Sequence, residues 1–193
     1  MRNSNSDTER RKRRRRRRIQ IIVVYTAIAV GLAWFFESQA TTTVIFVRHA
    51  EKALLPEGDP ALSPAGERRV AELTRQLVDA DVVAGIDAVY STPFRRTEET
   101  VRPVAEALGL TVHSYDPTNT EEIMERIVKE HKGKIILVVG HSNTVPALIG
   151  NMGASKKVPD IAENEYDNIY IVSIPWFGKT KTIRLRYGEP YIP

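Results

Sequence analysis

Two hydrophobic periods alternate along residues 41–193. Short apolar runs, such as KIILVV over residues 134–139, are typical of buried strands. Longer segments repeat apolar positions at helical spacing, as Val70, Leu73 and Leu77 do. The pattern predicts strands over residues 42–48, 86–90, 110–115, 134–139, 168–174 and 179–187, and helices over residues 63–80, 93–108, 120–131 and 143–151. This alternation predicts an α/β fold, a three-layer sandwich whose mainly parallel central sheet has helices on both faces.

The N-terminal segment has a different pattern. Residues 19–36 carry no charged side chain, and as a helix at about 1.5 Å per residue they span roughly 27 Å, close to the ~30 Å hydrocarbon core of a membrane. Basic residues 10–18 precede this stretch, and Trp34 lies near its other end. Basic flanks stay on the cytoplasmic side, and aromatic side chains favour the interface. We expect a single-pass signal anchor in the inner (plasma) membrane, with residues 41–193 on the periplasmic, extracytoplasmic side.

Two other interpretations of this segment remain. A signal peptide cleaved near Ala40 would release the domain to the periplasm, although the apolar stretch exceeds the usual length of about 7–15 residues. A buried core helix would leave the adjoining basic run unexplained. The basic run is expected to bind anionic membrane lipid rather than nucleic acid.

The distribution of charge and the lack of cysteine limit the kinds of reactive site that this chain can form. The formal net charge is +4, but residues 1–18 hold ten basic and two acidic side chains, and the rest of the chain holds 18 basic and 22 acidic ones. The body of the protein is therefore acidic. The absence of cysteine excludes disulfides, thiolate nucleophiles and cysteine-ligated metal sites. Histidine chemistry must come from His49, His113, His131 or His141.

Three polar clusters follow predicted strands. RHAE (48–51) follows the first, STPFRR (91–96) the second and GHSN (140–143) the fourth. Parallel strands bring their carboxyl ends to one edge of a sheet, where ligands bind. Arginine forks match phosphate oxygens, and a neutral histidine can accept a phosphoryl group covalently. The clusters therefore predict a phosphoryl-transfer site that needs no metal ion.

The same motifs resemble those of the histidine phosphatase (phosphoglycerate-mutase-like) superfamily. VRHAEK (47–52) is similar to its Arg-His-Gly/Ala signature, and LSPAG (62–66) to the opening of its first helix. YSTPFRRTEET (90–100) is similar to the segment with the second phosphate-binding arginine, and VGHSNTVP (139–146) to the segment with the second catalytic histidine. The resemblance covers residues 42–187, and it implies a phosphoglycerate-mutase-like fold and a small phosphatase branch with an N-terminal membrane anchor.

The resemblance also implies roles for individual residues. His49 would accept the phosphoryl group, Arg48 and Arg96 would bind its oxygens, and His141 would stabilise the transition state. Many family members place a general acid after the third strand, where Asp116 stands here. Arg95 is expected to point to solvent or to the leaving group, and Glu51 to orient Arg48 or cap a turn.

The expected domains are a basic cytoplasmic tail (1–18), a transmembrane signal anchor (19–36) and a histidine phosphatase domain (41–193). The expected activity is that of a phosphoric monoester hydrolase without metal or cofactor, acting on a phosphorylated small molecule or a phosphoprotein, phosphohistidine included. The domain has little room for the insertions that build lids in mutases, which favours hydrolysis. One alternative is a phosphate-ligand-binding module of the same fold with little or no catalysis. Another is a membrane-tethered interaction protein that acts through its arginine tail.

Overall fold

The central element is a mixed sheet of six strands. The computed structural model describes residues 4–37, 41–79, 85–154 and 158–192. The strands are β1 (Thr42–Arg48), β2 (Ala88–Ser91), β3 (Val112–Ser114), β4 (Ile135–Gly140), β5 (Asn168–Ile174) and β6 (Lys181–Arg186), in the order β3-β2-β4-β1-β5-β6. Strands β1 to β4 are parallel, whereas β5 and β6 run antiparallel to their neighbours β1 and β5. The prediction of a mainly parallel α/β sheet is confirmed.

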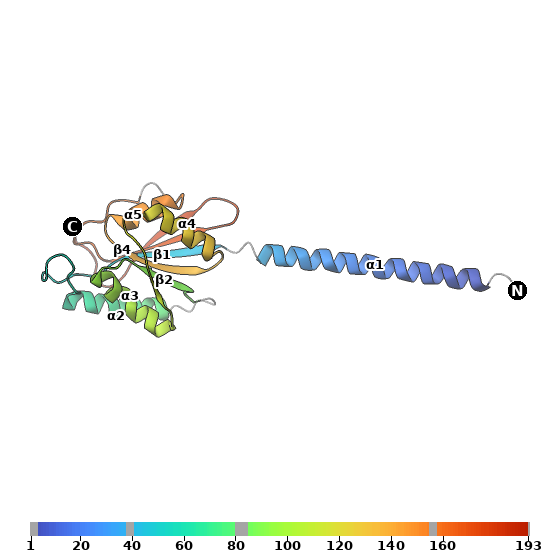
Figure 1. The fold of residues 1–193 in the computed structure, drawn as a ribbon, viewed down its shortest axis with the longest axis horizontal. Coiled ribbons are helices and arrows are strands. Elements are labelled where there is room, and N and C mark those ends of the chain that lie inside the picture. The colour runs from blue at the N-terminus through green and yellow to red at the C-terminus, as the bar shows by residue number, and fades with distance from the viewer. Residues whose placement is uncertain (1–3, 38–40, 80–84, 155–157, 193) are drawn as a thin grey trace. The chain divides into compact units, whose positions relative to one another are not determined.

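Helices cover both faces of this sheet (Figure 1). Helices α2 (Pro64–Val78) and α3 (Arg95–Leu108) pack on one face, and α4 (Thr120–Glu130) and α5 (Thr144–Asn151) on the other. Strand β1 shows why the apolar runs are continuous: Val44 and Phe46 face α4 and α5, while Ile45 and Val47 face α2 and α3. Successive side chains of a strand point to opposite faces, so a strand covered on both sides is apolar throughout.

Local signals account for several helix ends. Ser63 caps α2 by accepting a hydrogen bond from Gly66 N at 3.1 Å, and Pro64 occupies the first turn. Helix α3 ends at Gly109, which adopts the left-handed conformation at φ 67°. Most elements begin or end within two residues of their predicted bounds. The end predicted for helix α2, at Ala80, lies outside the described residues.

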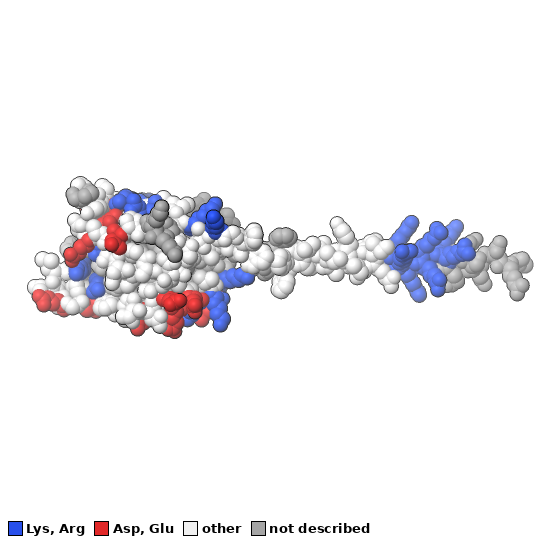
Figure 2. Space-filling model, turned by 90° about the horizontal axis from the view of Figure 1, so that it is seen from above, with Lys and Arg blue, Asp and Glu red and all other residues white. Residues whose placement is uncertain are grey.

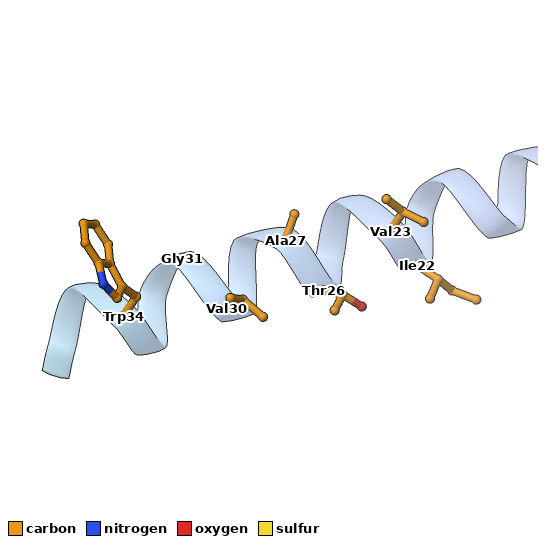
Figure 3. Close-up of a pocket in the computed structure, with 7 residues that line it drawn as sticks. All are labelled: Ile22, Val23, Thr26, Ala27, Val30, Gly31 and Trp34. Carbon is orange, nitrogen blue, oxygen red and sulfur yellow. The ribbon is translucent and has the colours of Figure 1, made fainter.

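Helix α1 (Ser4–Glu37) forms a unit by itself, because the chain divides into compact units of residues 1–39 and 40–193. Its residues Arg10–Phe35 are long and apolar enough to cross a membrane, with a mean hydropathy of 1.7 over the most apolar window, and a signal sequence passes the same test. Figure 2 shows the basic side chains gathered toward the N-terminal end of this helix and an uncharged stretch after them. One side of the helix carries a shallow hollow (Figure 3) lined by Ile22, Val23, Thr26, Ala27, Val30, Gly31 and Trp34.

The predicted apolar span is continuous with the basic run in this helix, since α1 extends back to Ser4. Arginine and lysine are good helix formers, so the helix continues through the basic residues that precede the apolar stretch. The cleavage site considered near Ala40 lies outside the described residues.

Candidate active site

The three polar clusters meet at one end of the sheet. Arg48, the last residue of β1, pairs with Gly140, the last residue of β4, and Ser91 at the end of β2 pairs with Val139. All three strands are parallel, so the loops that follow them leave from the same edge. The structure thereby brings the motifs around His49, Arg96 and His141 together.

His49 is held in one orientation by its own loop. Its side chain is buried, with 4% of the residue exposed, and its backbone N–H donates to Gly140 O at 2.9 Å. Nδ1 lies 2.8 Å from the carbonyl oxygen of Ala50. A carbonyl oxygen only accepts, so Nδ1 must carry the hydrogen and Nε2 keeps its lone pair. His49 therefore presents a nucleophilic nitrogen.

His141 faces His49 and is fixed by neighbours from other elements. The two ring centroids are 5.3 Å apart, with planes inclined at 64°. Nε2 of His141 lies 2.9 Å from the hydroxyl of Thr92, and Nδ1 lies 3.5 Å from a terminal nitrogen of Arg96. Because the guanidinium only donates, Nδ1 is the acceptor and Nε2–H donates to Thr92. Phe94 packs its ring against His141 at a centroid distance of 5.1 Å.

Arg48 is buried and held by the loop that precedes β5. Its Nη1 donates to the carbonyl oxygens of Ala162 at 2.6 Å and Glu165 at 3.1 Å. Its guanidinium carbon lies 4.1 Å from the ring centroid of Tyr166, within reach of a cation–π interaction. The ring of Tyr166 is in turn 5.9 Å from that of His49. This loop therefore holds the guanidinium of Arg48 in place and supplies the aromatic ring of Tyr166 beside His49.

Arg96 lies at the start of α3, with 14% of its side chain exposed. Its guanidinium stacks over Phe94 at 4.5 Å and forms an ion pair with Asp59 at 3.7 Å. Among the described side chains, the buried Nε atoms of Arg48 and Arg96 have no hydrogen-bond partner. Protein acceptors therefore leave part of both guanidinium forks unsatisfied.

Burial and positive charge keep both imidazoles neutral. Burial, with smaller contributions from Arg48, His141 and Arg96, lowers the pKa of His49 to about 3. Burial, reinforced by Arg96 and Arg48, lowers the pKa of His141 to about 4. Two cationic side chains and two neutral imidazoles thus lie together at this end of the sheet. Such a set can bind an anion and supply a neutral nucleophile at ordinary pH.

The other candidate residues form their described contacts with partners outside this cluster. Asp116 is exposed and accepts hydrogen bonds from the backbone and hydroxyl of Thr118, at 2.8 and 2.7 Å, which forms a local turn. Arg95 is exposed and pairs with Glu99. Glu51 does not orient Arg48 in the described contacts. Its carboxylate pairs with Arg69 of α2 at 2.7 Å, since Arg48 is already held by backbone carbonyls.

Three residues near the site were not singled out from the sequence: Thr92, Asp59 and Tyr166. Thr92 lies inside a quoted motif, but nothing in that motif marks its hydroxyl as the partner of His141. Asp59 and Tyr166 lie in loops without periodicity, so no local signal identifies them. Across the described part of the chain, no group of three or more His, Cys, Asp or Glu side chains is placed to hold a metal ion.

The model of the histidine phosphatase superfamily (branch 1) matches residues 44–117, a range that contains Arg48, His49 and Arg96. No protein of curated function matches the sequence at a significant level.

Solved structures share the fold at low sequence identity. The protein histidine phosphatase SixA complexed with tungstate is 20% identical, with a TM-score of 0.60, over 75% of this chain and 96% of that one. A mycobacterial glucosyl-3-phosphoglycerate phosphatase is 12% identical, with a TM-score of 0.56, over 69% of this chain and 90% of that one. YhfR of Bacillus stearothermophilus is 14% identical, with a TM-score of 0.55, over 68% and 90%. The chain therefore shares the fold of these phosphatases, and its residues 44–117 match the model of the histidine phosphatase superfamily.

Proposed function

We propose that residues 41–193 form a metal-independent phosphatase that hydrolyses a phosphomonoester or a phosphohistidine through a phosphohistidine intermediate on His49. The observation that carries the proposal is the hydrogen bond from Nδ1 of His49 to the carbonyl of Ala50 at 2.8 Å. This bond leaves Nε2 unprotonated on a ring that faces His141 and lies within electrostatic reach of Arg48 and Arg96. A binding module with little or no catalysis would need the arginines but not this tautomer.

The first chemical step forms the covalent intermediate. Arg48, Arg96 and His141 bind the phosphoryl oxygens, and Nε2 of His49 attacks phosphorus. The P–N bond forms as the bond from phosphorus to the leaving group breaks. The leaving oxygen or nitrogen takes a proton from a general acid or from water. The protein contributes position and charge neutralisation, which dominate the catalysis of phosphoryl transfer.

The second step restores the enzyme. Water attacks the phosphoryl group on the side opposite Nε2 and gives a proton to the base left by the general acid, or to solvent. The P–N bond breaks, and inorganic phosphate leaves with the oxygen of that water. Burial, reinforced by two arginines, keeps the pKa of His141 low. A bound phosphate dianion offsets those charges and raises that pKa, so His141 can then hold a proton toward a phosphoryl oxygen. His49 returns to its neutral form without a net change.

We propose Asp116 as the general acid, although its described hydrogen bonds keep it in a turn with Thr118. Its support is its place after β3, on the edge of the sheet that carries the other site residues. Asp116→Asn should lower turnover of esters with poor leaving groups more than turnover of nitrophenyl phosphate, whose leaving group needs little protonation. If the variant turned over each class of ester as fast as the parent does, Asp116 would not be the general acid.

We propose that α1 anchors the protein in the plasma membrane, with residues 1–18 cytoplasmic and the domain outside. The support is the uncharged stretch 19–36 after nine basic residues. An extracytoplasmic domain favours phosphorylated small molecules or proteins of the cell envelope as substrates. A phosphohistidine on a protein is the second candidate, since SixA in the solved structure is a protein histidine phosphatase.

The deciding experiment is hydrolysis of several phosphomonoesters and a phosphohistidine peptide by the detergent-solubilised chain with a chelator. We expect turnover that survives the chelator, disappears in His49→Ala and persists in His113→Ala, a matched change on exposed β3. Acid-labile phosphate retained on the denatured parent protein, and absent from His49→Ala, would identify the intermediate. Binding of tungstate or phosphate without turnover of any ester would instead support the binding module.

A further inference from the structure

The connection between β5 and β6 exposes two neighbouring aromatic side chains. Trp176 is 55% exposed and Phe177 is 87% exposed, and their ring centroids are 6.5 Å apart. Lys179 and Lys181 follow immediately and are also exposed. Residues 175–181 are called the base hairpin below. An adjacent pair of exposed aromatic rings in a soluble domain is a sign of an interaction surface.

The base hairpin lies at the end of the sheet opposite the candidate active site. Strand pairing places Ile174, just before the hairpin, beside Thr42, the first residue of β1. His49 follows the last residue of β1, and the six steps from Thr42 to Arg48 cover about 20 Å at roughly 3.3 Å per residue. The base hairpin and the beginning of β1 therefore share one end of the domain, and the site residues share the other.

Further basic residues lie at the same end. Lys134 precedes β4, and its carbonyl accepts a hydrogen bond from Thr43 N at 2.9 Å, which places it on the other side of the beginning of β1. Lys132 and Lys134 are exposed. The nearby carboxylate of Asp87 is occupied by the backbone N–H of Ile135. Exposed aromatic rings bordered by lysines match the chemistry of a membrane interface with anionic headgroups.

The chain itself ties this end to the anchor. Five peptide steps separate Glu37, the last residue of α1, from Thr42, and n residues cannot extend beyond about 3.6 Å each, or roughly 18 Å here. However these residues are arranged, the beginning of β1 stays within that distance of the end of α1. This step rests on the proposal that α1 is a membrane anchor.

We propose that the base hairpin inserts Trp176 and Phe177 into the interface of the membrane that α1 crosses, with Lys179 and Lys181 on anionic headgroups. This second contact sets the orientation of the domain. The edge that carries His49, Arg96 and His141 then faces the aqueous phase. Its substrates are phosphorylated groups that arrive from solution, not the headgroups of lipids in the same bilayer.

Tryptophan fluorescence of the full chain tests this orientation, because the protein has only two tryptophans. Trp34→Phe leaves Trp176 as the single reporter, in liposomes of phosphatidylcholine and phosphatidylglycerol with or without bromine near the headgroup end of the acyl chains. The matched control carries Trp34→Phe, Trp176→Phe and Leu54→Trp, since Leu54 is 94% exposed in the loop next to the active-site edge. We expect roughly twofold quenching of Trp176 by brominated lipid and little quenching of the control.

Each outcome decides between the proposals. Lys179→Glu with Lys181→Glu should reduce the quenching of Trp176, and more so as the fraction of phosphatidylglycerol rises. Protein that floats with the liposomes but shows no quenching of Trp176, or equal quenching at both ends, overturns the hairpin contact and leaves the anchor standing. Protein that does not float with the liposomes contradicts the anchor, and with it the hairpin contact.

Discussion

The hydroxyl of Thr92 lies 2.9 Å from Nε2 of His141 and joins the loop after β2 to the loop after β4. The same hydroxyl is 2.8 Å from that of Thr97 in α3. His141 therefore takes its orientation from residues of a different strand and helix. Its Nδ1 edge is turned toward Arg96.

Thr92→Val tests this relationship. The variant keeps the shape of the side chain but removes the acceptor for Nε2–H, so His141 loses its fixed orientation. We expect kcat to fall by about 10-fold, the equivalent of one hydrogen bond worth roughly 1.4 kcal/mol. Thr92→Ser should retain most of the activity. Steady-state kinetics on one phosphomonoester checks this, and equal loss in both variants would point to packing instead of the hydrogen bond.

The acid limb of the pH profile follows from the pKa of His49. Protonation of Nε2 would remove the nucleophile, but burial lowers the pKa of His49 to about 3. An ordinary histidine has a pKa of about 6.5, and its activity would fall below that value. We expect kcat/KM, corrected for ionisation of the substrate, to show no such loss between pH 7 and pH 5. A fall in kcat/KM with a midpoint near pH 6.5, present in the parent and retained in His113→Ala, would contradict the low pKa.

Stability should depend on pH through the same group. In the unfolded chain His49 binds a proton below pH ~6.5, whereas in the folded protein it binds one only near pH 3. Between these values the unfolded state binds more protons, so the free energy of unfolding falls as pH falls. Urea unfolding of the chain in detergent, from pH 7 to pH 4, should show this slope. The slope should become shallower in His49→Gln, with the remainder due to groups such as His141, whose pKa is also lowered, and it should be unchanged in His113→Gln on the exposed strand β3.

Tyr166 is expected to act by positioning Arg48. Its ring lies 4.1 Å from the guanidinium carbon. Tyr166→Leu should raise KM and lower kcat/KM by up to about 10-fold, since a partly desolvated cation–π contact contributes ~1 kcal/mol. Tyr166→Phe keeps the ring and should behave as the parent. A phenylalanine variant as weak as the leucine variant would instead assign a role to the hydroxyl.

Gly66 holds the opening of α2 against the loop that carries His49. A Cβ added there would overlap the carbonyl oxygen of Glu51, two residues beyond His49. Gly66→Ala should destabilise the domain by about 1–3 kcal/mol, as overpacking does. It should also reduce activity, because the strain falls on the catalytic loop. Gly150→Ala in α5 is the matched control, since nothing lies within 4 Å of its added Cβ. Thermal unfolding of both variants is the measurement, and similar midpoints would refute the contact.

The helices and strands, and the reactive residues at the strand ends, follow from the residue pattern alone. Burial on both faces imposes continuous apolar runs such as 44–47 and 134–139, and a helix against a sheet imposes helical spacing as at Val70 and Leu73. Those constraints are local, so they can be read from neighbouring residues. The motifs around His49, Arg96 and His141 can also be read locally, because each is a short run of consecutive residues that directly follows a strand.

The groups that surround these motifs depend on how the chain packs in three dimensions. Arg48 rests on carbonyls of Ala162 and Glu165 and on the ring of Tyr166, more than a hundred residues away in the chain. Glu51 pairs with Arg69 and not with Arg48, and Asp59 reaches Arg96 from an irregular loop. These contacts depend on how loops close over a folded sheet, and loop residues carry no periodic pattern that reports their partners. The same is true of the base hairpin, whose position beside the beginning of β1 follows from the antiparallel register of β5.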